Sequence, residues 1–152
     1  MKSAEATVRL RELQKALPLT LAMPELVPAR SQAIVRDLAS QAAEELGRPS
    51  LQAAIWLYVD ELDRSHTISQ SMKGPVGALW HGIMHRREGD FWNSKYWLRQ
   101  AKGHAAYLAL GHDPEAFVDS VEADQGQNSE ELVQQQRREW KALFDWSRKE
   151  EG

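Results

Sequence analysis

The 152-residue chain contains no cysteine. This absence excludes disulfide bonds, thiolate metal ligands and a cysteine nucleophile. The chain also lacks any apolar run close to the roughly 20 residues that a membrane-spanning helix needs. Its first residues, MKSAEATVRLRELQ, are too charged for the apolar core of a secretory signal. We therefore expect a cytoplasmic protein with no membrane partner.

A strong charge of one sign is absent as well, because the net charge is only −3. Residues 48–112 carry eight basic and five acidic groups, whereas residues 113–152 carry five basic and eleven acidic groups. An excess of three positive charges in the middle segment is too small for a nucleic-acid-binding face, which is normally strongly basic. We therefore expect no nucleic-acid partner. The oligomeric state stays open.

No segment alternates apolar and polar residues as a half-buried strand does, and helical spacing dominates the chain. The pattern predicts an all-α, single-domain bundle over residues 1–152, with about seven helices stacked as antiparallel hairpins. Residues 18–30 contain three prolines and are predicted to form a connector that packs on the body. The predicted helices cover residues 3–17, 31–46, 51–71, 75–88, 92–102, 114–123 and 130–150, with a short helical piece at 104–110.

Capping residues and prolines mark several of these helix ends. Ser50 is expected to cap the helix over 51–71, which is the most apolar one and is predicted to be central. Pro75 suits the first position of the next helix, and Asp90 or Asn93 is expected to cap the helix after it. Asp113 followed by a proline predicts another helix start.

Two stretches resemble each other at a distance of 29 residues: ELDRSHTISQSM and DFWNSKYWLRQA. Ser65 matches Ser94 in this pairing, and Leu62 matches Phe91. The second stretch, with Gly82 and Gly89 before it, resembles half of a tetratricopeptide or Sel1-like repeat. The period is shorter than the 34 residues of that family. The resemblance implies a helical-hairpin geometry in the middle of the chain.

A second resemblance rests on SHTISQ, on WHGIMHRREGDFWNSKYW and on the glycine–histidine pair that follows. These motifs cover roughly residues 55–105 and resemble an uncharacterised family of small helical proteins from bacteria and fungi. The family has no assigned activity, so the resemblance implies a site but not a reaction. The residues that it places in one constellation are His66, His81, His85, Arg86, Glu88, Asp90, Asn93, Tyr96 and Arg99.

The stretch HGIMHRREGD allows a metal site. His81, His85 and Glu88 stand at positions i, i+4 and i+7, which share one face of a helix. Imidazole and carboxylate ligands suit zinc, iron, nickel or manganese. A fourth ligand is expected from the preceding helix, where the candidates are Asp60, Glu61, Asp63 and His66. The chain contains neither the zinc-protease pattern His-Glu-x-x-His nor the Glu-x-x-His of di-iron bundles.

The main expectation is that no metal is bound, because Arg86 and Arg87 beside the histidines disfavour a dication. In this interpretation the cluster is a polar core in which an arginine pairs with Glu88, Asp90 or Asp63. Buried charges are tolerated only when they are paired and hydrogen-bonded.

A ligand pocket is the third interpretation, since His, Glu and Arg side chains are joined by aromatic ones that would form its walls. The expected walls are Trp56, Trp80, Trp92, Tyr96 and Trp97. We expect the cluster to bind a small molecule or a protein. The alternative is a metal-dependent enzyme that uses His81, His85 and Glu88. The sequence identifies no cofactor.

Overall fold

The computed structural model describes residues 33–150, and it confirms the all-α prediction. The predicted helix over 3–17, the connector over 18–30 and the first two residues of the helix predicted over 31–46 lie outside the described residues. The described part contains eight helices: α2 (Ala33–Leu46), α3 (Pro49–Tyr58), α4 (Leu62–Ser71), α5 (Pro75–Arg87), α6 (Phe91–Arg99), α7 (Ala105–Leu110), α8 (Pro114–Asp124) and α9 (Glu130–Glu150).

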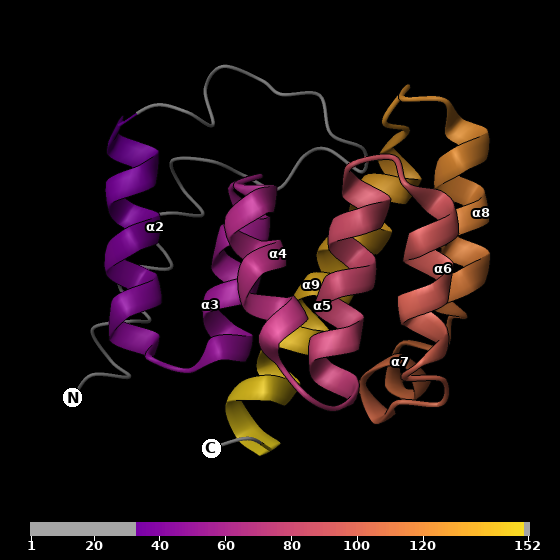
Figure 1. The fold of residues 1–152 in the computed structure, drawn as a ribbon. Coiled ribbons are helices and arrows are strands. Elements are labelled where there is room, and N and C mark those ends of the chain that lie inside the picture. Colours follow the sequence, from indigo (N-terminus) through magenta and orange to yellow (C-terminus); the bar gives the residue numbers. More distant parts are fainter. Residues whose placement is uncertain (1–32, 151–152) are drawn as a thin grey trace.

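Helices that are neighbours in the sequence are mostly neighbours in space (Figure 1). From α2 at one side, the structure continues through the α3–α4 pair and the α5–α6 pair to α8 at the other side. The long helix α9 crosses behind this row, and it packs against α3 and α7. No helix within residues 33–150 has the length and apolar character that a membrane span requires.

The connection between α3 and α4 is a tight turn in which Asp60 has a left-handed backbone, with φ of 59°. The backbone N–H of Glu61 donates to the carbonyl oxygen of Trp56 at 2.9 Å, which closes the end of α3. The buried hydroxyl of Ser65 on α4 then donates to the carbonyl oxygen of Ala53 on α3 at 2.8 Å. This bond joins the two helices as one hairpin.

The α5–α6 hairpin has the same closure, displaced by 29 residues. Gly89 takes the left-handed position with φ of 85°, and the N–H of Asp90 donates to the carbonyl oxygen of His85 at 2.8 Å. The hydroxyl of Ser94 on α6 donates to the carbonyl oxygen of Gly82 on α5 at 2.7 Å. Both hairpins therefore use a serine to bring the second helix onto the backbone of the first.

The single helix predicted over 51–71 is wrong, because this segment forms α3 and α4. The predicted cap is wrong too: Arg48 precedes the first turn of α3, and Ser50 is buried inside that turn. The prediction failed because the turn at Asp60 contains neither glycine nor proline. Other predicted helix starts are confirmed, since Pro75 opens α5, Asp90 caps α6 and Asp113 caps α8.

Helix α5 is the most enclosed of the hairpin helices, with 11 of its 13 residues buried. Gly82 lies where α5 and α6 approach most closely. A Cβ atom built there would lie 2.7 Å from Cγ of Leu98 and 3.1 Å from the backbone oxygen of Ser94. Only glycine allows this approach, so it sets the distance between the two helices.

We expect Gly82→Ala to lower the free energy of unfolding by about 1–3 kcal/mol, the usual cost of overpacking. The loss should occur although alanine favours a helix more than glycine does. Urea denaturation of the single variants and of Gly82→Ala combined with Leu98→Ala measures it. The cost of Gly82→Ala should shrink in the Leu98→Ala background; an unchanged cost would show that Leu98 is not the limiting contact.

Candidate metal centre

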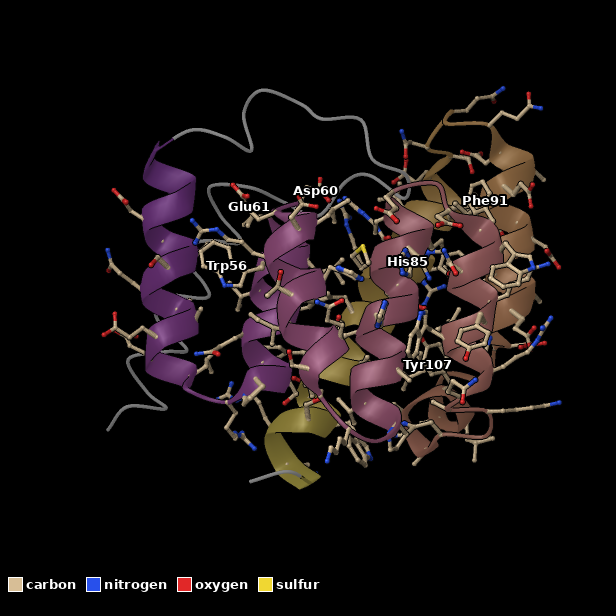
Figure 2. The ribbon with its side chains drawn as sticks, in the orientation of Figure 1. Trp56, Asp60, Glu61, His85, Phe91 and Tyr107 are labelled. Atoms are coloured by element: carbon tan, nitrogen blue, oxygen red, sulfur yellow. The ribbon has the colours of Figure 1, made fainter. Side chains whose placement is uncertain are left out.

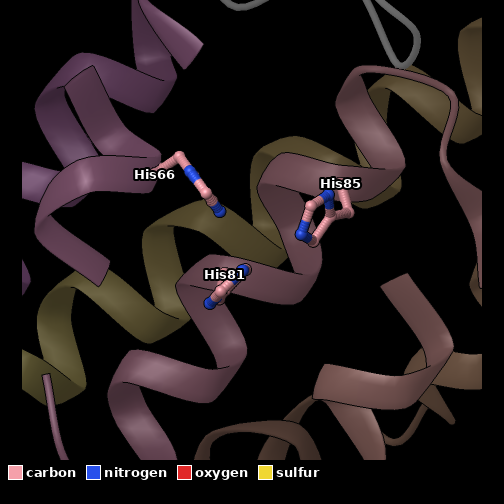
Figure 3. A group of neighbouring side chains, drawn as sticks. All are labelled: His66, His81 and His85. Atoms are coloured by element: carbon pink, nitrogen blue, oxygen red, sulfur yellow. The ribbon is translucent and has the colours of Figure 1, made fainter. Parts of the chain in front are cut away.

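Three of the five histidines of the chain converge in front of α5 (Figure 3). His81 and His85 lie one turn apart on α5, and His66 reaches them from α4. The ring centroid of His66 lies 4.7 Å from that of His81 and 5.4 Å from that of His85. The centroids of His81 and His85 are 4.8 Å apart. Two adjacent helices therefore present three imidazoles to one small space.

One nitrogen atom from each of the three histidines lies within 4.8 Å of the other two, as the ligands of a single metal ion require. The Nδ1 atom of His85 is 2.7 Å from the carboxylate of Glu88. This contact leaves Nε2 of His85 as the nitrogen available to the other two histidines. Glu88 is not part of this group; with His85 and Asp90 it forms a second group whose possible ligand atoms also lie within 4.8 Å of one another.

His81 is the most buried of the three, with 4 % of its surface exposed. The indole ring of Trp97 on α6 stacks on its imidazole, with centroids 4.0 Å apart and an angle of 14° between the planes. Burial, followed by the nearby charges of His85 and His66, lowers the pKa of His81 from 6.5 to about 4. At neutral pH this imidazole is therefore uncharged and its lone pair is free.

A second carboxylate, that of Asp90, lies next to the histidines at the start of α6. The carboxylate of Asp90 lies 4.0 Å from Nδ1 of His85 and accepts a hydrogen bond from the side chain of Asn93 at 2.6 Å. This hydrogen bond, the largest cause, lowers the pKa of Asp90. Asp90 thus lies next to His85, and Asn93 holds the Asp90 carboxylate.

Arg86 points to the opposite side of α5, into the core. Its guanidinium donates to both carboxylate oxygens of Glu139 on α9, at 2.7 and 3.0 Å, and to the side-chain oxygen of Gln136 at 3.0 Å. The hydroxyl of Tyr107 on α7 donates to the same carboxylate at 2.6 Å. The guanidinium also lies 4.5 Å from the ring centre of Phe117 on α8. One buried arginine thus joins four helices.

Arg87 is also buried, and it forms an ion pair with Asp60 in the turn between α3 and α4. The acidic partners that we expected for the two arginines were Glu88, Asp90 and Asp63, and neither pairs with any of these. The reason is helical rotation: positions 86 and 87 are turned by roughly 100° and 200° from position 85. A polar core therefore exists, but it excludes His66, His81 and His85.

The expected aromatic walls do not enclose one pocket. Trp80 is fully buried and packs against Trp140 with ring centroids 6.4 Å apart, and Trp56 is also buried. Trp92 and Tyr96 are instead 75 % and 46 % exposed and stack on each other at 6.1 Å. The edge of Tyr96 meets Trp97 at 5.3 Å, so aromatic rings continue from His81 to the surface.

Arg99 also lies apart from the histidines, since its guanidinium donates to Glu115 on α8 at 2.7 Å. Glu139 and Tyr107 were not singled out from the sequence, and Asp60 was named only as a possible metal ligand. A signal for Glu139 was present: it lies between Gln136 and Leu143 on the apolar side of α9, where a charged residue needs a buried partner. Figure 2 shows Asp60, His85 and Tyr107 on their separate elements.

Comparison of the chain with protein-family models, with curated proteins and with solved structures finds no match.

We expect Glu139→Gln to lower the free energy of unfolding by about 3–5 kcal/mol, because it leaves the buried Arg86 guanidinium without a countercharge. Glu88→Gln, which changes a half-exposed carboxylate, should alter it by about 0.5 kcal/mol or less. Chemical denaturation of both variants tests whether α5 has one face in the core, with Arg86, and another beside the histidines, with Glu88. Equal losses in the two variants would contradict it.

The lowered pKa of His81 predicts an acid-sensitive fold in metal-free protein. The unfolded chain binds a proton at His81 near pH 6.5, whereas the folded chain binds it only near pH 4. Stability should therefore be complete above pH 6.5 and should fall as the pH drops from 6.5 to 4. Melting temperatures across this window, with chelator present, should decrease more steeply for the native chain than for His81→Gln.

The comparison with His81→Gln is needed because burial also lowers the pKa values of His104 and His112. These two histidines contribute equally to both chains, so the difference in slope reports on His81 alone. Identical slopes would mean that His81 is protonated as easily in the folded chain as in the unfolded one.

Proposed function

We propose that this protein binds a divalent transition metal, with zinc as the first candidate, through His66, His81 and His85. The observation that carries the proposal is the convergence of three imidazoles from α4 and α5, with one nitrogen of each within 4.8 Å of the others. In a tetrahedral zinc site the Zn–N distances are about 2.0–2.1 Å, and the ligand nitrogens are then about 3.4 Å apart. Small rotations of the side chains bridge the difference.

The surroundings of the three histidines support this proposal. Metal-binding histidines usually donate their second ring N–H to a carboxylate, which fixes the tautomer and makes the ligand nitrogen more basic. Glu88 is placed for this role behind His85, at 2.7 Å from Nδ1. Trp97 holds the ring plane of His81 by stacking. These contacts keep two of the ligands oriented before a metal arrives.

We infer that Arg86 and Arg87 do not oppose a metal at the histidines. Arg86 and Arg87 stand beside His85 in the sequence, and they were expected to repel a dication. In the folded chain each is paired with a buried carboxylate, Glu139 or Asp60, and turned away from the histidines. The charged groups that lie against His85 are instead the carboxylates of Glu88 and Asp90. The local charge therefore favours a cation.

Three protein ligands leave a fourth tetrahedral position open, which is the arrangement of catalytic zinc sites. A metal held in this way lowers the pKa of a bound water molecule or polarises a carbonyl oxygen. The proposed function is therefore that of a metal-dependent enzyme, with Glu88 orienting His85 and Trp97 covering His81.

A second candidate function is the binding of an organic ligand or a protein next to this centre. The observation that favours it is the exposed, stacked pair of Trp92 and Tyr96 on α6, since exposed aromatic side chains are enriched at binding surfaces. Binding at this pair that persists in metal-free protein would belong to the second candidate and not to the metal centre.

Titration of untagged, chelator-treated protein with Zn²⁺ and Co²⁺ tests the metal proposal. Calorimetry should show one ion per chain, and the Co²⁺ form should have the visible absorption of a tetrahedral site. His66→Ala and His85→Ala should each abolish stoichiometric binding. Glu88→Gln should keep the stoichiometry and weaken affinity by about 10–100-fold, as loss of a carboxylate behind a ligand does.

His112→Gln is the matched control, because it replaces a histidine outside the cluster and should bind the ions like the native chain. Stoichiometric binding that survives His85→Ala, or that is lost in His112→Gln, would contradict the proposed ligands. The absence of stoichiometric binding in the native chain would contradict the function itself.

A further inference from the structure

A cavity of about 340 Å³ opens between the end of α6, the short helix α7 and the start of α8. Its volume lies within the range of small-molecule sites, roughly 300–1,000 Å³. It is separate from the histidines: none of its lining residues belongs to α4 or α5. Tyr107, one of the lining residues, marks its place in Figure 2.

The walls of this cavity are mainly apolar. Leu98 and Tyr107 line it with side chains that are almost fully buried, and Pro114 adds a further apolar surface. Leu108 also lines the cavity and is 71 % exposed, which makes it one of three large hydrophobic side chains exposed in the described part of the chain. A ligand with an apolar body would cover this surface and remove it from water.

Some of the charged groups at the cavity already have an ion-pair or hydrogen-bond partner, and others have none among the described residues. Glu115 pairs with Arg99, and Asp113 accepts the backbone N–H of Glu115 as the cap of α8. His112 is uncharged at neutral pH, because burial lowers its pKa. Lys102 lines the cavity with an exposed ammonium group. Within residues 37–149, this ammonium forms no ion pair with a carboxylate.

We propose that this cavity binds a small organic acid, with its apolar body against Leu98, Tyr107 and Leu108 and its carboxylate paired with Lys102. Apolar walls with one charged group that fixes orientation are the usual composition of a small-molecule site. The carboxylate supplies the partner that Lys102 lacks within residues 37–149, while Asp113 holds the α8 backbone and Glu115 holds Arg99. The inference is independent of the metal centre.

Titration of the untagged full chain with phenylpropanoate tests the inference, with chelator present throughout so that the histidines play no part. The acid should raise the melting temperature with increasing concentration. Phenylpropanol, which lacks the charge, should bind about fivefold more weakly, and phenylpropylamine, which reverses it, should give no stabilisation. A direct Kd from calorimetry should agree with the thermal shifts.

Two exposed positions allow variants that do not disturb the core. Lys102→Glu should weaken phenylpropanoate binding about tenfold or more, and Leu108→Ser should weaken phenylpropanoate and phenylpropanol alike. Lys73→Glu, the same charge change at an exposed position in the α4–α5 loop, should leave binding unchanged. The inference is overturned if phenylpropanoate does not bind, if the amine binds equally well, or if Lys102→Glu and Lys73→Glu have the same effect.

Discussion

The buried ion pair between Arg86 and Glu139 determines how the rest of the molecule is arranged. Both side chains are completely inaccessible to solvent, so neither charge is tolerated without the other. Gln136 and Tyr107 add two further hydrogen bonds to this pair, so that α5, α7 and α9 meet at one point. At its other end α9 is held by Arg48, whose guanidinium donates to the carbonyl oxygens of residues 147 and 148. The long helix is thereby fixed across the back of the hairpins.

Fixing Arg86 also fixes the rotation of α5 about its axis, and this places the histidines. With position 86 directed at α9, positions 81 and 85 are directed at α4 and α6. Arg87 reinforces the same rotation through Asp60 in the α3–α4 turn, which ties the first hairpin to the second. The two arginines of the stretch HRRE thus form ion pairs in the core. Its histidine and glutamate lie on the other side of α5.

The helix starts were predictable where the sequence has a proline or a capping side chain at the helix end. Proline at position 75 and the capping side chains of Asp90 and Asp113 gave correct helix starts. The turn at Asp60 carries no such marker, because its left-handed backbone is stabilised by a distant contact with Arg87. The 29-residue similarity contained the missing information. It aligns Asp60 with Gly89, so the glycine turn at position 89 predicts a turn at position 60 as well.

The candidate site was predictable as a set of residue types and not as an arrangement. Spacing alone placed His81, His85 and Glu88 together, whereas His66 was only one of four candidates on the preceding helix. Spacing does not say which face of a helix points into the core. Both arginines were therefore placed with the wrong partners. That choice depends on Glu139, which is more than fifty residues further along the chain. Once Glu139 takes Arg86 out of the cluster, the charged groups that remain next to His85 are the carboxylates of Glu88 and Asp90.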